Sequence, residues 1–376
     1  VQASLKDSRR GLVLGDLAAT VKGRLEGNTL QDLEFHLETG ELMLDELALD
    51  LPDHPLKPIS GRVNAELWGA WAPGRPLRID GVADLRDAGL DTGEEQLLLD
   101  RLNARVNWRW NDKTQWRLDL ADVRVAENDR DWIAPRITVE RNLEGGIASW
   151  VSADSLQVEF PLQAVQLFMR ELGYNWPAVA PTAGRGLVTD FDLVINANRK
   201  LAATSGQFED LEVLAWGDWP LPRGISGRAD LAFGQGSIWL SGDDVRIRWP
   251  RNFREPLIID LVDCEVEILW DETNHYQVDA LPCPLVSEAI EGQARLRFIR
   301  DEGKPRVDIN VAIDRADFSA LTPYWPASVL KPPVLDWIER SVQGGTTEDA
   351  RFVLRGDMDA FPFRSGEGTL LAEVPI

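Results

Sequence analysis

The chain has 376 residues, of which 44% are hydrophobic and 27% are charged, as is usual for a folded protein. Its formal net charge is -22 and its isoelectric point is about 4.6. Nucleic acid and anionic membrane surfaces would repel such a chain, so the charge excludes a nucleic-acid partner. No stretch approaches about 18 uncharged apolar residues, so the sequence predicts no helix that spans a bilayer.

The chain does not begin with Met, and no signal peptide is recognisable at its start. We therefore expect it to be an interior piece of a longer protein, with any targeting segment outside it.

The first clear strand pair is predicted in residues 104–120, ARVNWRWNDKTQWRLDL. Apolar and polar residues alternate there, which is the pattern of strands with one buried face. The apolar positions are Val106, Trp108, Trp110, Trp116, Leu118 and Leu120. For Trp110 and Trp116 to share a face, the turn between the strands must hold an odd number of residues. A three-residue turn at Asn111–Lys113, or a five-residue turn, meets this condition.

The same alternation recurs along the rest of the chain. Its apolar positions are Leu187, Phe191, Leu193 and Ile195; Ala229, Leu231 and Phe233; Val262, Cys264, Val266, Ile268 and Trp270; and Val307, Ile309, Val311 and Ile313. One-sided alternation is typical of antiparallel sheets, because parallel strands are buried on both faces. The sequence therefore predicts a mostly β, antiparallel fold, with about 25 strands if they form one long sheet.

Only two segments have helical periodicity. PLQAVQLFMRELG predicts a short amphipathic helix at 161–173, and PPVLDWIERSVQGG predicts another at 332–343. Each has a proline at its start and a glycine after its end. The helices divide the predicted organisation into five parts. These are strands in 1–160, the helix 161–173, strands in 174–331, the helix 332–343, and further strands in 344–376.

Two short helices cannot cover the apolar face of so many strands. The interpretation of the function therefore depends on what else covers that face. In one interpretation two sheets bury each other in a β-sandwich, and the protein is a scaffold with a dry core. In the other, one long sheet twists and curls, since sheets beyond about ten strands tend to curl or split. Its apolar face would then line an elongated groove suited to lipid tails.

The sequence carries no recognisable catalytic or metal-binding pattern. His36, His54 and His275 are far from one another and from the cysteines. The acidic pair Asp243–Asp244 lies in a turn-like context, where a solvated surface is expected. We therefore expect no enzyme activity, no metal and no cofactor. A carbohydrate-binding or carbohydrate-cleaving β-protein is a third alternative, because tryptophans and carboxylates are plentiful.

Cys264 and Cys283 fit either buried thiols or one disulfide, and buried thiols are the commoner state of such residues. The pair does not settle the compartment.

Residues from Asp314 onward contain a more specific pattern. The run L-T-P-Y-W-P is followed by a helix containing LDWI, a GG stop, FVLRG and FPF. This order resembles the YhdP family of AsmA-like proteins, and the segment from LQAVQLFMRELG to GRGLVTDFDLVI is similar to a second step of that family. The resemblance covers about a third of the chain.

The resemblance implies a Gram-negative envelope protein that crosses the periplasm from an inner-membrane anchor, which this chain lacks. Such proteins are similar in design to TamB and to bridge-like lipid transfer proteins, and they move phospholipid between the inner and outer membranes. The ligand would be the acyl chains of phospholipid. The groove-lining residues would be Val106, Trp108, Trp110, Trp116, Leu118, Phe191, Leu193, Ile195, Leu231, Phe233, Val266, Ile268, Trp270, Ile309 and Val311. Trp337 and Ile338 would form a gate or would cap the end of the groove.

Overall fold

The fold is described from a computed structural model of the chain. The structure describes residues 2–7, 12–26, 29–44, 57–91, 96–112, 114–127, 130–143, 147–159, 183–196, 201–215, 220–251, 253–271, 275–301, 304–325, 332–341, 344–360, 363 and 366–375. The predicted helix at 161–173 lies outside these residues, as do residues 342–343 of the second predicted helix.

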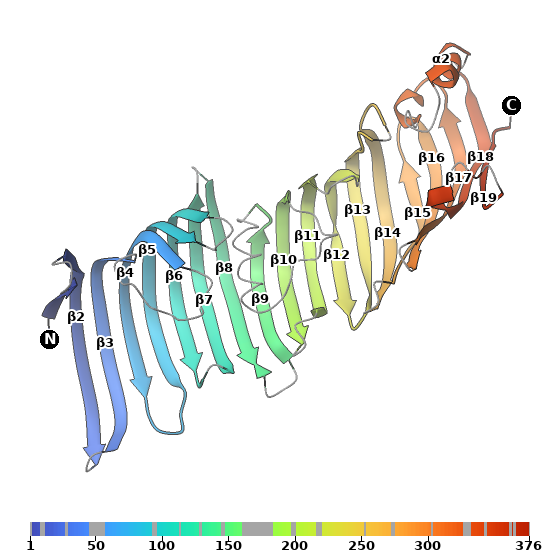
Figure 1. The fold of residues 1–376 in the computed structure, drawn as a ribbon. Coiled ribbons are helices and arrows are strands. Elements are labelled where there is room, and N and C mark those ends of the chain that lie inside the picture. The colour runs from blue at the N-terminus through green and yellow to red at the C-terminus, as the bar shows by residue number, and fades with distance from the viewer. Residues whose placement is uncertain are drawn as a thin grey trace. The chain divides into compact units, whose positions relative to one another are not determined.

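Nineteen strands account for almost all of the described structure (Figure 1). They are β1 (Gln2–Asp7), β2 (Leu12–Glu26), β3 (Thr29–Met43), β4 (Lys57–Trp71), β5 (Leu77–Asp91), β6 (Gln96–Trp110), β7 (Gln115–Glu127), β8 (Arg130–Asn142), β9 (Ile147–Gln157), β10 (Ala183–Asn196), β11 (Leu201–Ala215), β12 (Leu221–Ala232), β13 (Gln235–Arg248), β14 (Leu257–Trp270), β15 (Tyr276–Val286), β16 (Ile290–Asp301), β17 (Lys304–Asp317), β18 (Thr346–Asp357) and β19 (Gly368–Glu373). The helices are η2 (Thr322–Tyr324), α2 (Pro332–Ser341) and η3 (Met358–Ala360). About 25 strands were expected for the whole chain, and nineteen lie within the described residues.

All described strands belong to one antiparallel sheet, so the fold is mostly β. Each strand from β1 to β9 pairs with the next in the chain, and so does each strand from β11 to β19. β10 pairs with β9. The described strands therefore form an open, single-layer sheet, and the two-sheet sandwich that the sequence left open is not the fold.

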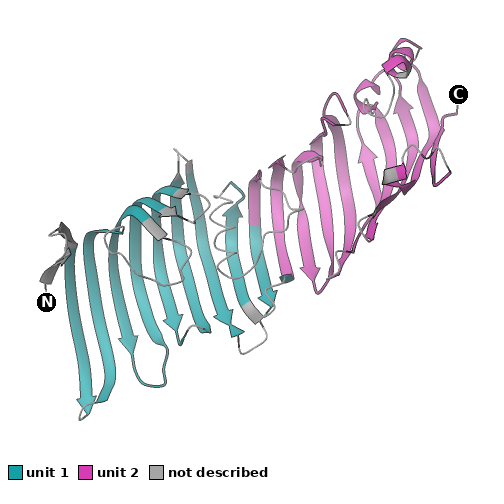
Figure 2. Cartoon of the chain, in the orientation of Figure 1, with its two compact units in different colours: residues 1–177, 189–202 teal, residues 178–188, 203–376 magenta. Residues whose placement is uncertain are grey.

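The chain divides into two compact units, coloured separately in Figure 2. Unit 1 comprises residues 1–177 and 189–202, and unit 2 comprises residues 178–188 and 203–376. In each unit the strands lie side by side in chain order, and they twist and curl along their length (Figure 2).

A recurring backbone device accompanies the curl. Seven aspartates inside strands have positive φ angles between 45° and 58°: Asp87, Asp122, Asp190, Asp210, Asp244, Asp263 and Asp349. Aspartate tolerates this left-handed conformation better than most residues. At Asp210 and at Asp244 the pairing register shifts, as it does at a β-bulge. Bulges bend a strand and increase its twist, so these residues help to curl the sheet in each unit.

The bulges also preserve the apolar face on both sides of the interruption. Leu120 and Val123, which flank Asp122, belong to the same hydrophobic cluster. A residue inserted into a regular strand would send every following side chain to the opposite face. The bulged aspartate accommodates the extra residue instead.

The first predicted strand pair has the expected face and turn parity. Trp110 pairs with Trp116, and Trp108 pairs with Leu118. Five residues lie between Trp110 and Trp116, so the turn is the five-residue one. A three-residue turn would have paired Trp110 with Thr114, and this pairing is not formed. The Asp112 carboxylate explains the longer turn, because it accepts hydrogen bonds from the backbone N–H groups of Thr114 (2.6 Å) and Gln115 (3.0 Å).

Of the two predicted helices, α2 at Pro332–Ser341 is described. No helix among the described residues has the length and apolar character needed to cross a membrane.

Candidate functional site

The cross-strand register defines two faces in unit 1. Ile79, Trp108, Leu118 and Val139 follow one another across β5 to β8, directly opposite at each step. We call this side the apolar face of unit 1. The adjacent positions Asp80, Asn107, Asp119 and Thr138 form the polar face in the same way. The alternation in the sequence therefore continues from strand to strand as two distinct surfaces.

One stretch of the apolar face is open. Trp108 and Trp110 retain 36% and 37% of their surface, although both occupy the apolar face. Val106, Trp116 and Leu118 are half-buried beside them. The structure thus brings these five predicted residues together on neighbouring strands. Large side chains that remain exposed in a row are unusual on a soluble surface and often mark a binding site.

Another stretch of the same face is closed. Leu193 and Ile195 on β10 retain 7% and 0% of their surface and pack against Val139 and Val151. Phe191 is partly buried and contacts this cluster. These three predicted residues therefore lie on the apolar face in a close-packed cluster, whereas Trp108 and Trp110 lie at an open surface.

Unit 2 has an apolar face of its own. Ile238, Val266, Ala280, Leu296 and Ile309 follow one another across β13 to β17. Six predicted residues lie on this face and are half-buried: Leu231, Val266, Ile268, Trp270, Ile309 and Val311.

The position predicted for Phe233 is wrong. β12 ends at Ala232, which pairs with Gln235, so Phe233 and Gly234 form a two-residue hairpin turn. Their φ angles are 51° and 86°, the left-handed conformation that tight hairpin turns require. Phe233 is therefore 87% exposed at a hairpin tip and does not lie on the strand face.

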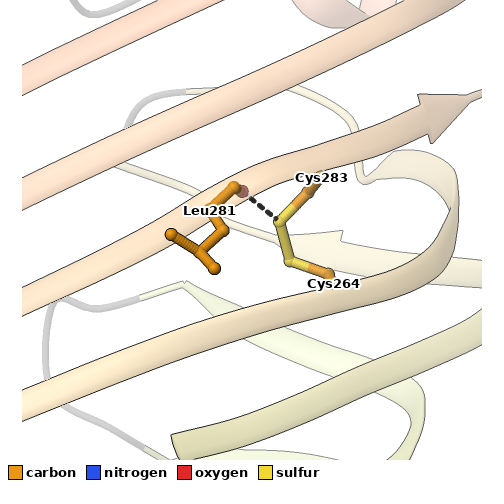
Figure 3. Close-up of a disulfide and its surroundings, with 3 residues drawn as sticks. All are labelled: Cys264, Leu281 and Cys283. Carbon is orange, nitrogen blue, oxygen red and sulfur yellow. Dashed lines mark hydrogen bonds between the residues drawn. A yellow bond between two sulfur atoms is a disulfide. The ribbon is translucent and has the colours of Figure 1, made fainter.

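Cys264 on β14 and Cys283 on β15 form a disulfide on the apolar side of unit 2 (Figure 3). Their Cα atoms are 4.7 Å apart, and both residues are buried. The Cys283 sulfur also lies 3.1 Å from the carbonyl oxygen of Leu281, a contact drawn in Figure 3. The structure thus resolves the alternative that the sequence left open: the cysteines are bonded.

Residues 321–325 of the L-T-P-Y-W-P motif follow β17 and contain η2. Leu321 is buried with Ala289 and Ala316, and Tyr324 and Trp325 pack against this cluster. The Tyr324 hydroxyl donates a 2.6 Å hydrogen bond to the carbonyl oxygen of Ile258 on β14. The motif therefore ties the segment after β17 to a strand three positions away in the sheet.

Trp337 and Ile338, the predicted gate or end cap, both lie on α2. Trp337 is 63% exposed and Ile338 is half-buried, whereas Leu335 on the same helix is buried. α2 therefore presents a tryptophan to the surroundings instead of burying it.

Carboxylates on the polar face of unit 1 neutralise a ladder of arginines. Arg62, Arg86 and Arg101 lie directly opposite one another on β4, β5 and β6. Asp84 bonds Arg86 (2.7 Å) and Arg101 (2.8 Å), and Arg62 bonds Asp87. Burial alone would raise the pKa of Asp84, but the hydrogen bonds from Arg101 and Arg86 lower it below its usual value. Asp84 is therefore charged at neutral pH and holds the ladder together.

The sequence analysis did not assign the tryptophans on the polar faces. Trp68 stacks on His36, with ring centroids 5.0 Å apart. Arg117 lies over Trp150, whose indole N–H donates to Asp192 at 2.9 Å. Along their strands these tryptophans alternate together with the charged residues. This alternation could have distinguished them, from the sequence, from the tryptophans of the apolar faces.

Within the described ranges no three His, Cys, Asp or Glu side chains are grouped so as to hold a metal ion.

Comparisons with known proteins assign the chain to a family and identify one curated relative. The model of the family described as YhdP protein matches residues 6–376. The chain belongs to the YhdP family. A curated relative, named intermembrane phospholipid transporter YhdP, from Escherichia coli strain K12, is 22% identical over 304 residues. The alignment covers 76% of this chain and 23% of the relative, so the chain spans about a quarter of that protein's length. No solved structure matches the chain.

Proposed function

We propose that the chain is a segment of a hydrophobic conduit that carries phospholipid between the inner and outer membranes. The observation that carries this proposal is the open apolar face of a single-layer sheet, with Trp108 and Trp110 exposed on it. The curl of each unit would turn such a face into a groove lined by the predicted residues other than Phe233. Membership of the YhdP family and the name of the curated relative support phospholipid as the cargo.

The energetics favour such a surface for this cargo. Each methylene costs about 0.8 kcal/mol to expose to water, so a phospholipid with about 30 methylenes cannot cross an aqueous gap unaided. A continuous wall of aliphatic and indole side chains would keep its tails out of water, while the headgroup stays at the open edge. A row of similar shallow sites binds weakly enough at each point to let the lipid move on.

No step of this process makes or breaks a covalent bond, so the proposal gives the chain no catalytic residue and no cofactor. Parts of the protein outside this chain would contact the two membranes, and one of them would anchor it to the inner membrane. The proposed location is the periplasm. The Cys264–Cys283 disulfide supports it, since such bonds form and persist in oxidising compartments.

The test is to purify the chain without detergent and to identify bound lipid by native mass spectrometry and lipid extraction. In the test variant, Trp108→Glu and Ile268→Glu place carboxylates on the two apolar faces. In the matched control, Trp68→Glu and Leu269→Glu change the same or similar residue types at exposed positions on the polar faces. Circular dichroism checks that both variants are folded.

We expect phospholipid on the parent and on the control, and little on the test variant. A parent that carries no lipid and cannot take up a fluorescent phospholipid would contradict the proposal. The envelope scaffold would then become the better interpretation. The closed cluster around Ile195 favours that second candidate, because it shows that part of the apolar face serves packing alone.

A further inference from the structure

We propose that one strand-end edge of unit 1 binds the phosphodiester of a phospholipid headgroup. We call this edge the rim and define it by Arg78, Arg109, Trp110, Trp116 and Arg141. All five lie close to the same ends of β5 to β8, with Trp110, Trp116 and Arg141 on the apolar face and Arg78 and Arg109 on the polar face. The inference rests on the proposed function and adds to it the place where the polar end of the cargo is recognised.

The apolar face changes character in its last cross-strand row. Trp110, Trp116, Arg141 and Ser149 are directly opposite one another on β6, β7, β8 and β9. One row further in, Trp108, Leu118, Val139 and Val151 are all apolar. The last row therefore replaces aliphatic side chains with two indoles, a guanidinium and a buried hydroxyl. Indoles and arginines take the same positions where lipid tails meet headgroups in membrane proteins.

Two polar atoms in that row have no hydrogen-bond partner. The Arg141 Nε and the Ser149 Oγ are both buried without one, and so is the Oδ1 of the adjacent Asn142. Buried polar groups in native proteins almost always find a partner, so each exception calls for an explanation. Two of these three can donate a hydrogen bond, as an anionic ligand requires.

The arginines on the other side of the rim are also unusual. Arg78, Arg109 and Arg117 are directly opposite one another on β5, β6 and β7. Arg117 bonds Asp119 (2.9 Å) and Glu140 (3.3 Å). Among the described residues, Arg78 and Arg109 have no ion pair within 4 Å and no side-chain hydrogen bond, and both are exposed. Arg109 acts on Asp119 only at longer range, where its charge helps to lower the pKa of that carboxyl. Like charges directly opposite each other destabilise a sheet, unless a counter-charge lies between them.

The ladder of Arg62, Arg86 and Arg101 in the same unit provides the contrast. There the protein supplies a carboxylate to every arginine. At the rim, among the described residues, Arg78 and Arg109 have no carboxylate within ion-pair distance, and Arg109 has only the longer-range attraction of Asp119, in a chain whose net charge is -22. An external anion can fill that role. A phosphodiester suits it, because its two non-bridging oxygens accept the charge-assisted hydrogen bonds that guanidinium groups make best.

The experiment measures how tightly the chain binds two soluble lipids with identical tails, dioctanoyl phosphatidylglycerol and dioctanoylglycerol, by titration of tryptophan fluorescence. Only the first carries a phosphodiester. The rim variant combines Arg78→Gln, Arg109→Gln and Arg141→Gln. The control variant combines Arg62→Gln, Arg86→Gln and Arg101→Gln, which changes the net charge equally in the neutralised ladder. A single Arg109→Gln variant and inorganic phosphate complete the set.

We expect the parent and the control to bind the phosphatidylglycerol at least about tenfold more tightly than the neutral lipid. The rim variant should lose this preference while it binds the neutral lipid as the parent does, and Arg109→Gln should lose part of it. Unchanged binding of the neutral lipid shows that the variant is folded.

Four other outcomes would overturn the inference, and they separate it from the proposed function. If the parent binds both lipids equally, or the rim variant keeps the preference, the rim is not a headgroup site and the proposed function stands. If inorganic phosphate binds the rim as tightly as the phospholipid, the site takes a free anion. If the parent binds neither lipid, the proposed function fails as well.

Discussion

Two stretches of one face in unit 1 differ in what covers them. Around Ile195 the apolar face is closed, and the side chains of β8, β9 and β10 bury one another. Around Trp108 the same face is open, with more than a third of each of two indoles exposed. Both stretches have the same alternating sequence pattern. The comparison teaches that alternation assigns a residue to a face, whereas neighbouring side chains determine whether that face is core or surface.

The largest expected effect is in the closed stretch. Ile195→Ala removes buried methylenes and leaves a cavity, which should lower the free energy of unfolding by about 2–5 kcal/mol. Trp108→Ala in the open stretch should cost less, roughly 1–2 kcal/mol, because part of that ring is already solvated. Urea unfolding of both variants checks the difference. Equal costs would mean that the two stretches are equally packed.

The disulfide extends the comparison to unit 2, where a covalent bond joins two strands on the apolar side. Replacing both cysteines with serine should lower the free energy of unfolding by about 3 kcal/mol, the size expected for a loop of this length. Hydrogen exchange should show the loss in β14 and β15 and leave the protection of β8 to β10 unchanged. A loss of protection spread evenly over both units would contradict this local role.

The smallest expected effect concerns a β-bulge in unit 2. Asp210→Val places a β-branched residue at a φ of 47° and should cost about 1–2 kcal/mol. Asp210→Gly should change the free energy of unfolding by less than about 0.5 kcal/mol, because glycine adopts this conformation freely. Thermal unfolding of the two variants makes the test. If both variants lost the same stability, the aspartate side chain rather than the backbone angle would be responsible.

Much of the fold could be predicted from the sequence. One-sided alternation indicated antiparallel strands, and the phase of Trp110 and Trp116 required an odd turn, as observed. The length of that turn could not be predicted, because it depends on the hydrogen bonds that the Asp112 carboxylate accepts within the turn. The residues of the first strand pair lie together on one face, as the candidate site requires, but their role in lipid binding stays a prediction.

Other features depend on interactions that periodicity does not encode. The seven aspartates with positive φ look like ordinary polar residues in the sequence, because a positive φ has no period. Phe233 continues the alternation by residue type but falls in the turn, since the hairpin closes one residue earlier. The disulfide could not be predicted, because it requires the strands that carry Cys264 and Cys283 to be neighbours. The structure shows that they are, since β14 pairs with β15.

The pairing of each strand with its neighbour in the chain has a consequence for how the protein assembles. Contacts between residues close in sequence form quickly, because little chain entropy is lost in closing each loop. A chain that emerges from a channel one end first can therefore complete each hairpin as it appears, without waiting for a distant strand. Each new strand then pairs with the edge left by the previous one, so the growing edge of the sheet is always formed by the most recent strand.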